Sequence, residues 1–280
     1  MPYGTWIIRE IESPKGYVLS EEEIAVTIGK VDEVVEIELV NYFIKGNIAL
    51  TKVDEDYPDN KLSGAVFEVY SDTNGDGKLD KDDTLLGEMK ELDGGVYQMS
   101  ELRYGKYLVK ETKAPTGFVL DENVYSVSVE ENGKTYTVEN KAGVGFINAA
   151  QKGSLKIVKT SSDGKVEGFS FRVTGVNYDK TFKTEKNGEI VIEGLRIGDY
   201  TVSEVSDKAS AGYILPADKQ VTVKVDATAI VQMHNEFRDT PKTGDDFNLG
   251  LWVSLAALSV VGAGVLGFVG YKNRKKKKED

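Results

Sequence analysis

Lysine, glutamate and asparagine recur in this chain at positions where a β-strand would bury them. The stretch GSLKIVK (153–159) has the period-two pattern of a strand, with Leu155, Ile157 and Lys159 on one side. An unpaired ammonium on an apolar face costs several kcal/mol unless it is neutralised or paired. This lysine therefore either lies at a strand end that reaches water or has a partner on the inside.

The same pattern leads to a polar residue six times. Alternating apolar residues precede two lysines, two glutamates and two asparagines: Lys52, Glu111, Asn148, Lys159, Glu204 and Asn235. We therefore expect each of two segments to place one lysine, one glutamate and one asparagine on apolar faces. One interpretation is a buried Lys–Glu ion pair capped by the asparagine, an arrangement that adds little to stability.

The other interpretation is covalent. An apolar site disfavours both charged forms, so the lysine tends to lose its proton and the carboxyl to keep one. The neutral amine is a nucleophile and the asparagine carboxamide is its electrophile. Glu111 or Glu204, as the protonated acid, polarises the amide and relays protons to departing ammonia. The predicted products are autocatalytic isopeptide bonds, Lys52–Asn148 and Lys159–Asn235.

These residues lie on internal repeats. NYFIKGNIALTK (41–52) aligns with NAAQKGSLKIVK (148–159). YGTWIIREIESPKGYVL (3–19) aligns with YGKYLVKETKAPTGFVL (104–120), and IGDYTVSEVSDKASAGYIL (197–215) is a weaker third copy. The period is roughly a hundred residues or less, so each copy is a domain and not a solenoid turn.

The repeats predict two complete domains and part of a third. The first copy has Glu10 and Asn41 but no lysine, so no bond is assigned there and the chain is expected to be incomplete at its N-terminus. The predicted parts are a truncated domain (1–45), two complete domains (46–150 and 151–238) and a C-terminal region (239–280).

The repeats resemble Cna B-type domains, the SpaA-like modules of Gram-positive adhesins and pilins. The resemblance covers nearly all of residues 3–236 and rests on the opening strand, the YGKYLVKETKAPTGF box and the closing asparagine. It implies an all-β fold of tandem prealbumin-like (Cna B-type, reverse Ig-like) β-sandwiches. It also implies an isopeptide bond between the lysine and the asparagine of each complete domain. The third copy departs from the box, because SEVSDKASAGY has no proline and a longer turn.

The stretch DTNGDGKLDKDD (72–83) has the ligand spacing of an EF-hand calcium loop, with Gly77 at the sharp turn. The spacing favours Ca²⁺ over a solvated acidic hairpin, and an aspartate at the last position weakens binding. The flanks VFEVYS and TLLGEM have strand patterns, so the loop belongs to a sandwich. No cofactor is required beyond this ion. The expected ligands are Asp72, Asn74, Asp76, the Lys78 carbonyl, Asp80 through water, and Asp83.

The C-terminal region has three parts in a fixed order: TPKTG (240–244), an uncharged apolar stretch (247–271) and a basic tail. The apolar stretch is long enough for a transmembrane helix, and the tail predicts a cytoplasmic C-terminus. The order resembles the LPxTG cell-wall sorting signal cleaved by sortases, which implies transfer of Thr243 to peptidoglycan or to another pilin subunit. The signal residues are Thr240, Pro241, Lys242, Thr243 and Gly244.

Composition narrows the function classes. The net charge is −11 although the basic tail is positive, so a nucleic-acid partner is not expected. The absence of cysteine removes disulfides, and a single histidine, His234, leaves little for histidine-based catalysis. We expect no enzyme. DYPDNK (56–61) has Asp59 where the polymerisation lysine of a shaft pilin would stand.

The expected function is a sortase-anchored stalk or pilin-like adhesin subunit of a Gram-positive cell surface, which bears tension and presents an upstream adhesive region. Thr240 stands where leucine is usual in the sorting signal. The alternative is therefore an uncleaved, membrane-anchored protein whose B-type domains themselves bind a host or bacterial ligand, such as a matrix or cell-surface component.

Overall fold

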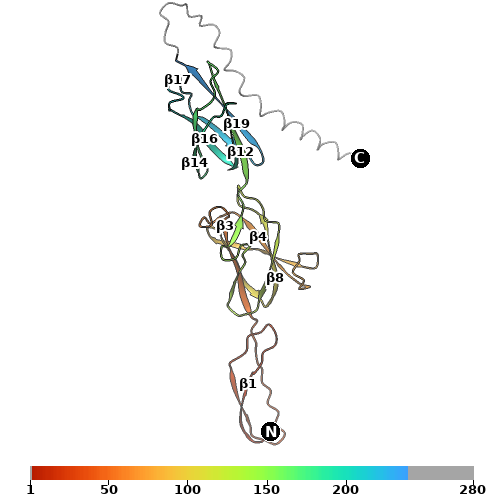
Figure 1. The fold of residues 1–280 in the computed structure, drawn as a ribbon. Coiled ribbons are helices and arrows are strands. Elements are labelled where there is room, and N and C mark those ends of the chain that lie inside the picture. The colour runs from red at the N-terminus through yellow and green to blue at the C-terminus, as the bar shows by residue number, and fades with distance from the viewer. Residues whose placement is uncertain (1, 239–280) are drawn as a thin grey trace, which may run out of the picture. The chain divides into compact units, whose positions relative to one another are not determined.

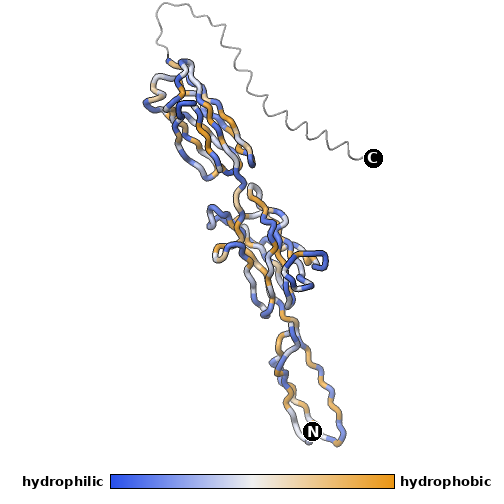
Figure 2. The backbone as a smooth tube through the Cα atoms, turned by 45° about the vertical axis from the view of Figure 1, so that its right-hand side comes forward, coloured by the Kyte–Doolittle hydropathy of each residue, from blue (hydrophilic) through white to orange (hydrophobic). Residues whose placement is uncertain are grey.

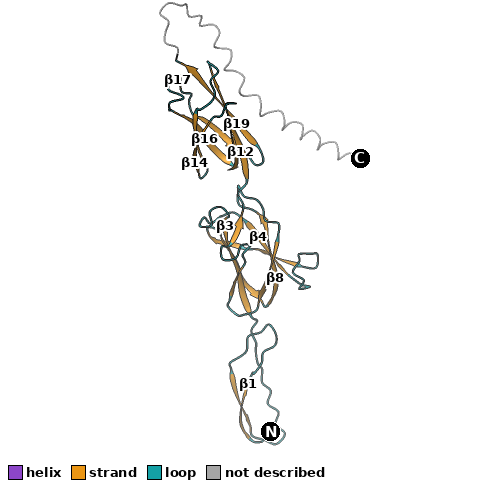
Figure 3. Ribbon diagram, viewed as in Figure 1, coloured by secondary structure: helices purple, strands orange, loops and turns teal. Residues whose placement is uncertain are grey.

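The computed structural model describes residues 2–238, whose regular elements are all β-strands (Figures 1 and 3). Figure 2 shows hydrophobic and hydrophilic residues alternating in short runs along these strands, the pattern that buries one strand face and exposes the other. The all-β prediction is confirmed. Among the described residues, no helix is long and apolar enough to cross a membrane.

The first segment contains one antiparallel pair, β1 (Gly4–Arg9) and β2 (Glu23–Ile28). The stretch VEIELVN (35–41) has the alternating pattern of a closing strand, but no strand forms there, and residues 33–42 carry no strand pairing. In a complete copy this stretch pairs with an opening strand, and the described residues of the first segment contain none. The apolar side chains of the stretch are consequently exposed, for example 38% at both Ile37 and Leu39.

The second segment is a sandwich of two sheets. Its strands are β3 (Lys45–Asp54), β4 (Val66–Ser71), β5 (Thr84–Glu88), β6 (Lys90–Asp93), β7 (Val96–Arg103), β8 (Gly105–Lys113), β9 (Val124–Val129), β10 (Thr135–Thr137) and β11 (Phe146–Asn148). One sheet has the order β10-β3-β7-β6, and β11 also pairs with β3. The other has the order β5-β4-β8-β9.

The closing strand of the second segment is shorter than the alternation of Val144, Phe146 and Asn148 predicts. Residues 142–144 form a turn, so Val144 lies outside β11. Gly143 and Gly145 have φ of +71° and +131°, a backbone that ends the extended strand. Gly145 also lies so close to β3 that a Cβ would come within 2.8 Å of the Thr51 carbonyl oxygen. β10 supplies the remaining parallel pairing with β3.

The third segment repeats the sandwich. Its strands are β12 (Lys152–Ser161), β13 (Ser170–Gly175), β14 (Tyr178–Lys183), β15 (Glu189–Arg196), β16 (Gly198–Val205), β17 (Tyr213–Ile214), β18 (Lys219–Val223) and β19 (Thr228–Phe237). The sheets have the orders β15-β12-β19-β17 and β14-β13-β16-β18. The opening strand β12 and the closing strand β19 are parallel neighbours, as β3 and β11 are in the second segment.

Each sandwich buries one apolar core between its two sheets. In the third segment Leu155 and Ile157 of β12 pack with Phe171 and Val173 of β13 from the facing sheet. The second segment has a matching cluster that includes Leu50 of β3. The buried side of each opening strand is the side that the period-two pattern predicts, and each lysine continues that side.

The second residue of each opening strand is a glycine at a place that leaves no room for a side chain. A Cβ on Gly46 would lie 2.8 Å from the Lys134 carbonyl oxygen and 2.8 Å from a methyl carbon of Val129. A Cβ on Gly153 would lie 2.1 Å from the Lys224 carbonyl oxygen. The crowding atoms include backbone atoms, which cannot move aside without shifting the strand.

We predict that Gly46→Ala lowers the free energy of unfolding by about 1–3 kcal/mol, because overpacking a close backbone approach forces a shift. The measurement is urea-induced unfolding followed by fluorescence. Gly105→Ala is the matched control, since its nearest neighbour atom, on Tyr107, would lie 3.8 Å away in ordinary contact. Equal stability of the two variants would show that the close approach of β3 is not a constraint.

Candidate functional site

The second sandwich brings together the three polar residues that the sequence singles out. Lys52 on β3 and Asn148 on β11 lie on neighbouring parallel strands, and Glu111 projects from β8 in the facing sheet. All three are buried: 0% of Lys52 and Glu111 and 3% of Asn148 are exposed. A lysine, a carboxyl and a carboxamide therefore share one closed site between the sheets.

The three side chains are in direct contact. Lys52 Nζ donates a hydrogen bond to Asn148 Oδ1 and lies 3.5 Å from Glu111 Oε1. The Asn148 Nδ2 group donates to both Glu111 oxygens, at 3.0 and 2.8 Å. The amine thus lies on one side of the carboxamide, and the carboxyl lies beside the nitrogen that would leave.

Burial dominates the electrostatics of this site. Desolvation lowers the pKa of Lys52 from 10.5 to about 8, although the nearby Glu111 carboxyl opposes the shift. The ring of Phe146 lies 4.7 Å from the Lys52 ammonium and gives the cation a weakly favourable contact. A fraction of this lysine is neutral near physiological pH, and a neutral amine beside a carboxamide can attack it.

Two further residues hold the site, and the sequence reasoning missed both. The Asp121 backbone N–H donates to Glu111 Oε2 at 2.8 Å. The Asn140 side chain accepts from the Ile147 N–H at 2.6 Å and donates to the Ile147 carbonyl at 2.9 Å, next to Asn148. The Asn140 Nδ2 group also donates a hydrogen bond to Asp121 Oδ2. The only sequence signal for Asp121 is its place directly after the repeated box.

The third sandwich brings together only part of the corresponding site. Asn235 Nδ2 donates to Glu204 Oε1 at 2.6 Å. Lys159 is 1% exposed and desolvation lowers its pKa, but its Nζ donates to the Thr160 carbonyl oxygen at 2.5 Å. Within residues 2–238, the buried atoms Glu204 Oε2 and Asn235 Oδ1 have no hydrogen-bond partner. Asn235 and Glu204 are therefore in contact, whereas the Lys159 amine is directed to the Thr160 carbonyl oxygen.

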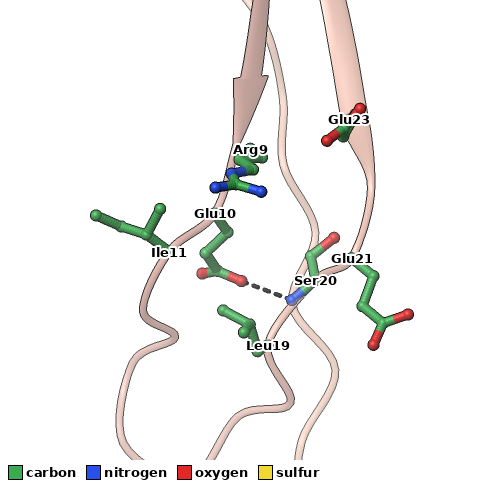
Figure 4. Close-up of a pocket in the computed structure, with 7 residues that line it drawn as sticks. All are labelled: Arg9, Glu10, Ile11, Leu19, Ser20, Glu21 and Glu23. Carbon is green, nitrogen blue, oxygen red and sulfur yellow. Dashed lines mark hydrogen bonds between the residues drawn. The ribbon is translucent and has the colours of Figure 1, made fainter.

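The first segment has the acid and the amide without a lysine. Asn41 Nδ2 donates to Glu10 Oε1 at 2.7 Å. The Ser20 backbone N–H donates to Glu10 Oε2 at 2.7 Å, the bond drawn in Figure 4. This carboxyl lines an open cavity of about 490 Å³ together with Arg9 and Leu19 (Figure 4). The hydrogen bond between the asparagine and the glutamate therefore forms in a segment whose described residues include no opening strand with a lysine.

The acidic loop 72–83 connects β4 and β5, as predicted from its flanks. Its carboxylates accept hydrogen bonds from loop N–H groups: Asp72 from Gly75 at 2.7 Å, and Asp83 from Asp80 at 2.9 Å. Within residues 2–238 no group of three or more His, Cys, Asp or Glu residues is placed to hold a metal ion. Calcium binding by this loop stays a prediction.

The predicted sorting signal and the apolar stretch 247–271 lie outside the described residues, so the transmembrane helix also stays a prediction.

Comparison with known proteins identifies the repeats. The SpaA family, described as a prealbumin-like fold domain, matches residues 1–42, 46–142 and 153–237. No curated protein matches the chain. The solved structure of the Bacillus anthracis TIE protein is similar over 85% of this chain and 42% of that chain, with 26% identity and a TM-score of 0.64.

Two pilin structures are also similar to this chain. A minor pilin of Streptococcus agalactiae has 16% identity and a TM-score of 0.32, over 72% of this chain and 100% of its own. The shaft pilin SpaA of Lactobacillus rhamnosus GG has 13% identity and a TM-score of 0.31, over 70% of this chain and 99% of its own. The present chain spans less than half the length of the TIE protein. Because the matched segments make up most of the sequence, the chain belongs to the SpaA prealbumin-like fold domain family.

Proposed function

We propose that the chain is a sortase-anchored stalk or pilin-like subunit of a Gram-positive cell surface, in which each complete domain is crosslinked by one isopeptide bond. The bonds join Lys52 to Asn148 and Lys159 to Asn235. The observation that supports this best is the buried contact of Lys52 Nζ with the Asn148 carboxamide, with Glu111 beside the leaving nitrogen. The crosslink forms once in each domain, so the protein is structural and not a turnover enzyme.

The chemistry needs no reagent from outside. The Lys52 ammonium passes a proton to Glu111, 3.5 Å away, and becomes a neutral amine. The amine attacks Asn148 Cγ, the Glu111 carboxylic acid protonates Nδ2, and the resulting carboxylate then takes a proton from Nζ. The Nζ–Cγ bond forms, the Cγ–Nδ2 bond breaks and ammonia leaves. One proton remains on Glu111, so atoms and charge balance.

The third domain follows the same steps after one rearrangement. Lys159 must leave the Thr160 carbonyl and turn toward Asn235, whose Oδ1 is buried without a partner among the described residues. Burial raises the pKa of Glu204, which favours the protonated acid that the reaction uses.

The mechanical value of the crosslinks comes from the strand order. Lys52 and Asn148 are 96 residues apart in sequence but lie on the neighbouring first and last strands of their domain. By the chain-entropy argument used for disulfides, closing such a loop stabilises the folded state by roughly 4–5 kcal/mol. A chain without cysteine has no disulfide for this purpose, and no reductant cleaves an amide bond.

Anchoring completes the proposal. A sortase would cleave after Thr243 and join it to peptidoglycan or to another pilin subunit, and residues 247–271 would hold the precursor in the membrane until then. The family membership and the order of signal, apolar stretch and basic tail support this placement at the cell surface. Binding of a host or bacterial ligand by the domains themselves belongs to the alternative, an uncleaved, membrane-anchored protein.

The proposed crosslinks predict a loss of mass. The intact mass of the full chain should fall below its sequence mass by two ammonia masses, one for each bond. Glu111→Ala should lose only one, because its second domain lacks the proton relay. Glu88→Ala is the control: this exposed glutamate lies on β5, and the variant should lose two. A wild-type mass equal to the sequence mass would refute the crosslinks.

The burial of Lys52 predicts that stability depends on pH when the crosslink cannot form. In Asn148→Ala the second domain cannot crosslink, and Lys52 stays buried with a pKa lowered from 10.5 to about 8. Below pH 8 both the folded and unfolded chains hold the proton, and its burial penalty is fully present. Between pH 8 and 10.5 the unfolded chain holds more protons, so the free energy of unfolding rises with pH. The total rise should be about 3 kcal/mol.

The measurement is urea unfolding across that pH range. The double variant Lys52→Met/Asn148→Ala is the control, since it keeps every other titrating group and should lack this rise. If both variants show the same pH dependence, Lys52 is not buried as an amine with a lowered pKa.

The proposed sorting signal predicts cleavage by a sortase. A purified LPxTG-cleaving sortase with triglycine should release residues 244–280 and leave triglycine attached to Thr243, as intact mass would show. Thr240→Leu should react faster because it restores the usual motif, and Pro241→Ala should react much more slowly. Resistance of both wild type and Thr240→Leu to cleavage would support the uncleaved, membrane-anchored alternative.

A further inference from the structure

The box glutamates of the first two copies, Glu10 and Glu111, each accept a hydrogen bond from a backbone N–H at the same place in the repeat. The Ser20 N–H donates to Glu10 Oε2 at 2.7 Å, as Figure 4 shows, and the Asp121 N–H donates to Glu111 Oε2 at 2.8 Å. Each donor is the third residue after the aromatic residue of the repeated box, in YVLS (17–20) and FVLD (118–121). The same oxygen of the carboxyl thus receives the same backbone donor in both copies.

The third copy has a proline at this place. In YILP (213–216) the third residue after the aromatic is Pro216, and proline has no N–H to donate. Glu204 Oε2 is the atom that would receive the bond. It is buried and has no hydrogen-bond partner among the described residues, while Oε1 accepts from Asn235. The copy whose sequence lacks the backbone donor is therefore also the copy whose glutamate has a buried oxygen without a partner among the described residues.

We propose that Pro216 is a positioning residue for crosslinking in the third domain: by withholding a hydrogen-bond donor, it biases Glu204 toward the protonated acid that the reaction needs. This inference rests on the isopeptide chemistry proposed above and deepens it. It assigns a role to a residue outside the Lys–Glu–Asn set.

The physical reason is a competition between two states of the same composition. The ion pair of Lys159 ammonium and Glu204 carboxylate does not react, whereas the neutral amine and carboxylic acid do; the two differ only in where one proton lies. A backbone N–H on the carboxyl favours the charged form. Its absence lowers the population of the ion pair relative to the neutral pair, and the crosslinking rate follows the neutral pair.

The other groups around Glu204 act in both directions. Lys159 on β12 and the bond from Asn235 on β19 favour the carboxylate, whereas Asp207, which follows β16, favours the acid. Burial is the largest influence and raises the pKa of Glu204. Asp163 accepts a hydrogen bond from the Tyr213 hydroxyl at 2.6 Å. Its negative charge favours the protonated form of Lys159 and so opposes the lowering of that pKa by burial. The missing donor acts in the same direction as burial, because both favour the protonated form of Glu204. In this domain the Lys159 amine still contacts the Thr160 carbonyl and not Asn235.

The test measures crosslinking rate against pH. The full chain, recovered unfolded in urea from inclusion bodies, is diluted into detergent-containing native buffers from acid to alkaline pH. Samples are quenched at intervals and digested, and the Lys159–Asn235 crosslinked peptide is quantified by mass spectrometry. The variants are Pro216→Ala and Pro216→Ser, the latter matching Ser20. The Lys52–Asn148 peptide in the same samples is the internal control.

Restoring the N–H should slow crosslinking of the third domain about tenfold on the pH plateau, the effect of one hydrogen bond to a charged group. The acidic limb of the profile should move about one pH unit lower. Below that limb both wild type and variant start from the doubly protonated pair, which the donor does not stabilise, so their rates should coincide. The second domain should be unaffected.

Equal rates of wild type and variants at every pH would overturn the inference, and so would slowing by the same factor at every pH, which indicates structural damage alone. If neither variant folds, Asp121→Pro is compared with Asp121→Ala in the second domain. The proline removes the donor and should react about tenfold faster than the alanine on the plateau; an equal or slower rate overturns the inference. If wild type forms no Lys159–Asn235 bond at all, the proposed function itself fails.

Discussion

The burial of a lysine ammonium between two β-sheets is the constraint on which the rest of this fold depends. Lys52 has no access to solvent, and its partners come from two directions: Asn148 on the neighbouring strand and Glu111 on the facing sheet. A slip of any of these strands by one residue would turn its polar side chain to the outside and leave the others unpaired in the core. The site thus helps to specify the register of β3, β8 and β11, as the apolar core also does.

The two complete domains meet this constraint by different means. In the third domain the opening and closing strands pair along eight residues, from Ser154 to Ser161 of β12. In the second domain β11 pairs with β3 over only three residues. There the Asn140 side chain bonds both the N–H and the carbonyl of Ile147, in place of strand neighbours. A side-chain network holds the reactive asparagine where the backbone ladder is short.

Alternation in the sequence was enough to predict the buried side of the opening strands and the inward placement of Lys52 and Lys159, whereas the sandwich class came from the resemblance to Cna B-type domains. It did not predict the turn that shortens β11, because Gly143 and Gly145 act through backbone conformation, which a polarity pattern does not record. It also missed the role of Asp121, whose contribution to Glu111 is a backbone N–H that any residue except proline provides. The direction of Lys159 depends on a rotamer choice between Thr160 and Asn235 and has no sequence signature.

With the proposed bond in place, force would take a short path through each domain. Tension entering along β3 would cross from Lys52 to Asn148 and leave through β11, so the chain between these residues would carry little load. That bypassed stretch contains the acidic loop 72–83, whereas the matching strands of the third domain, β13 and β14, are joined by a tight turn. Insertions between the crosslinked residues change the surface of the domain without lengthening its load path. A crosslink between first and last strands therefore separates the parts of a domain that bear tension from the parts that are free to acquire loops.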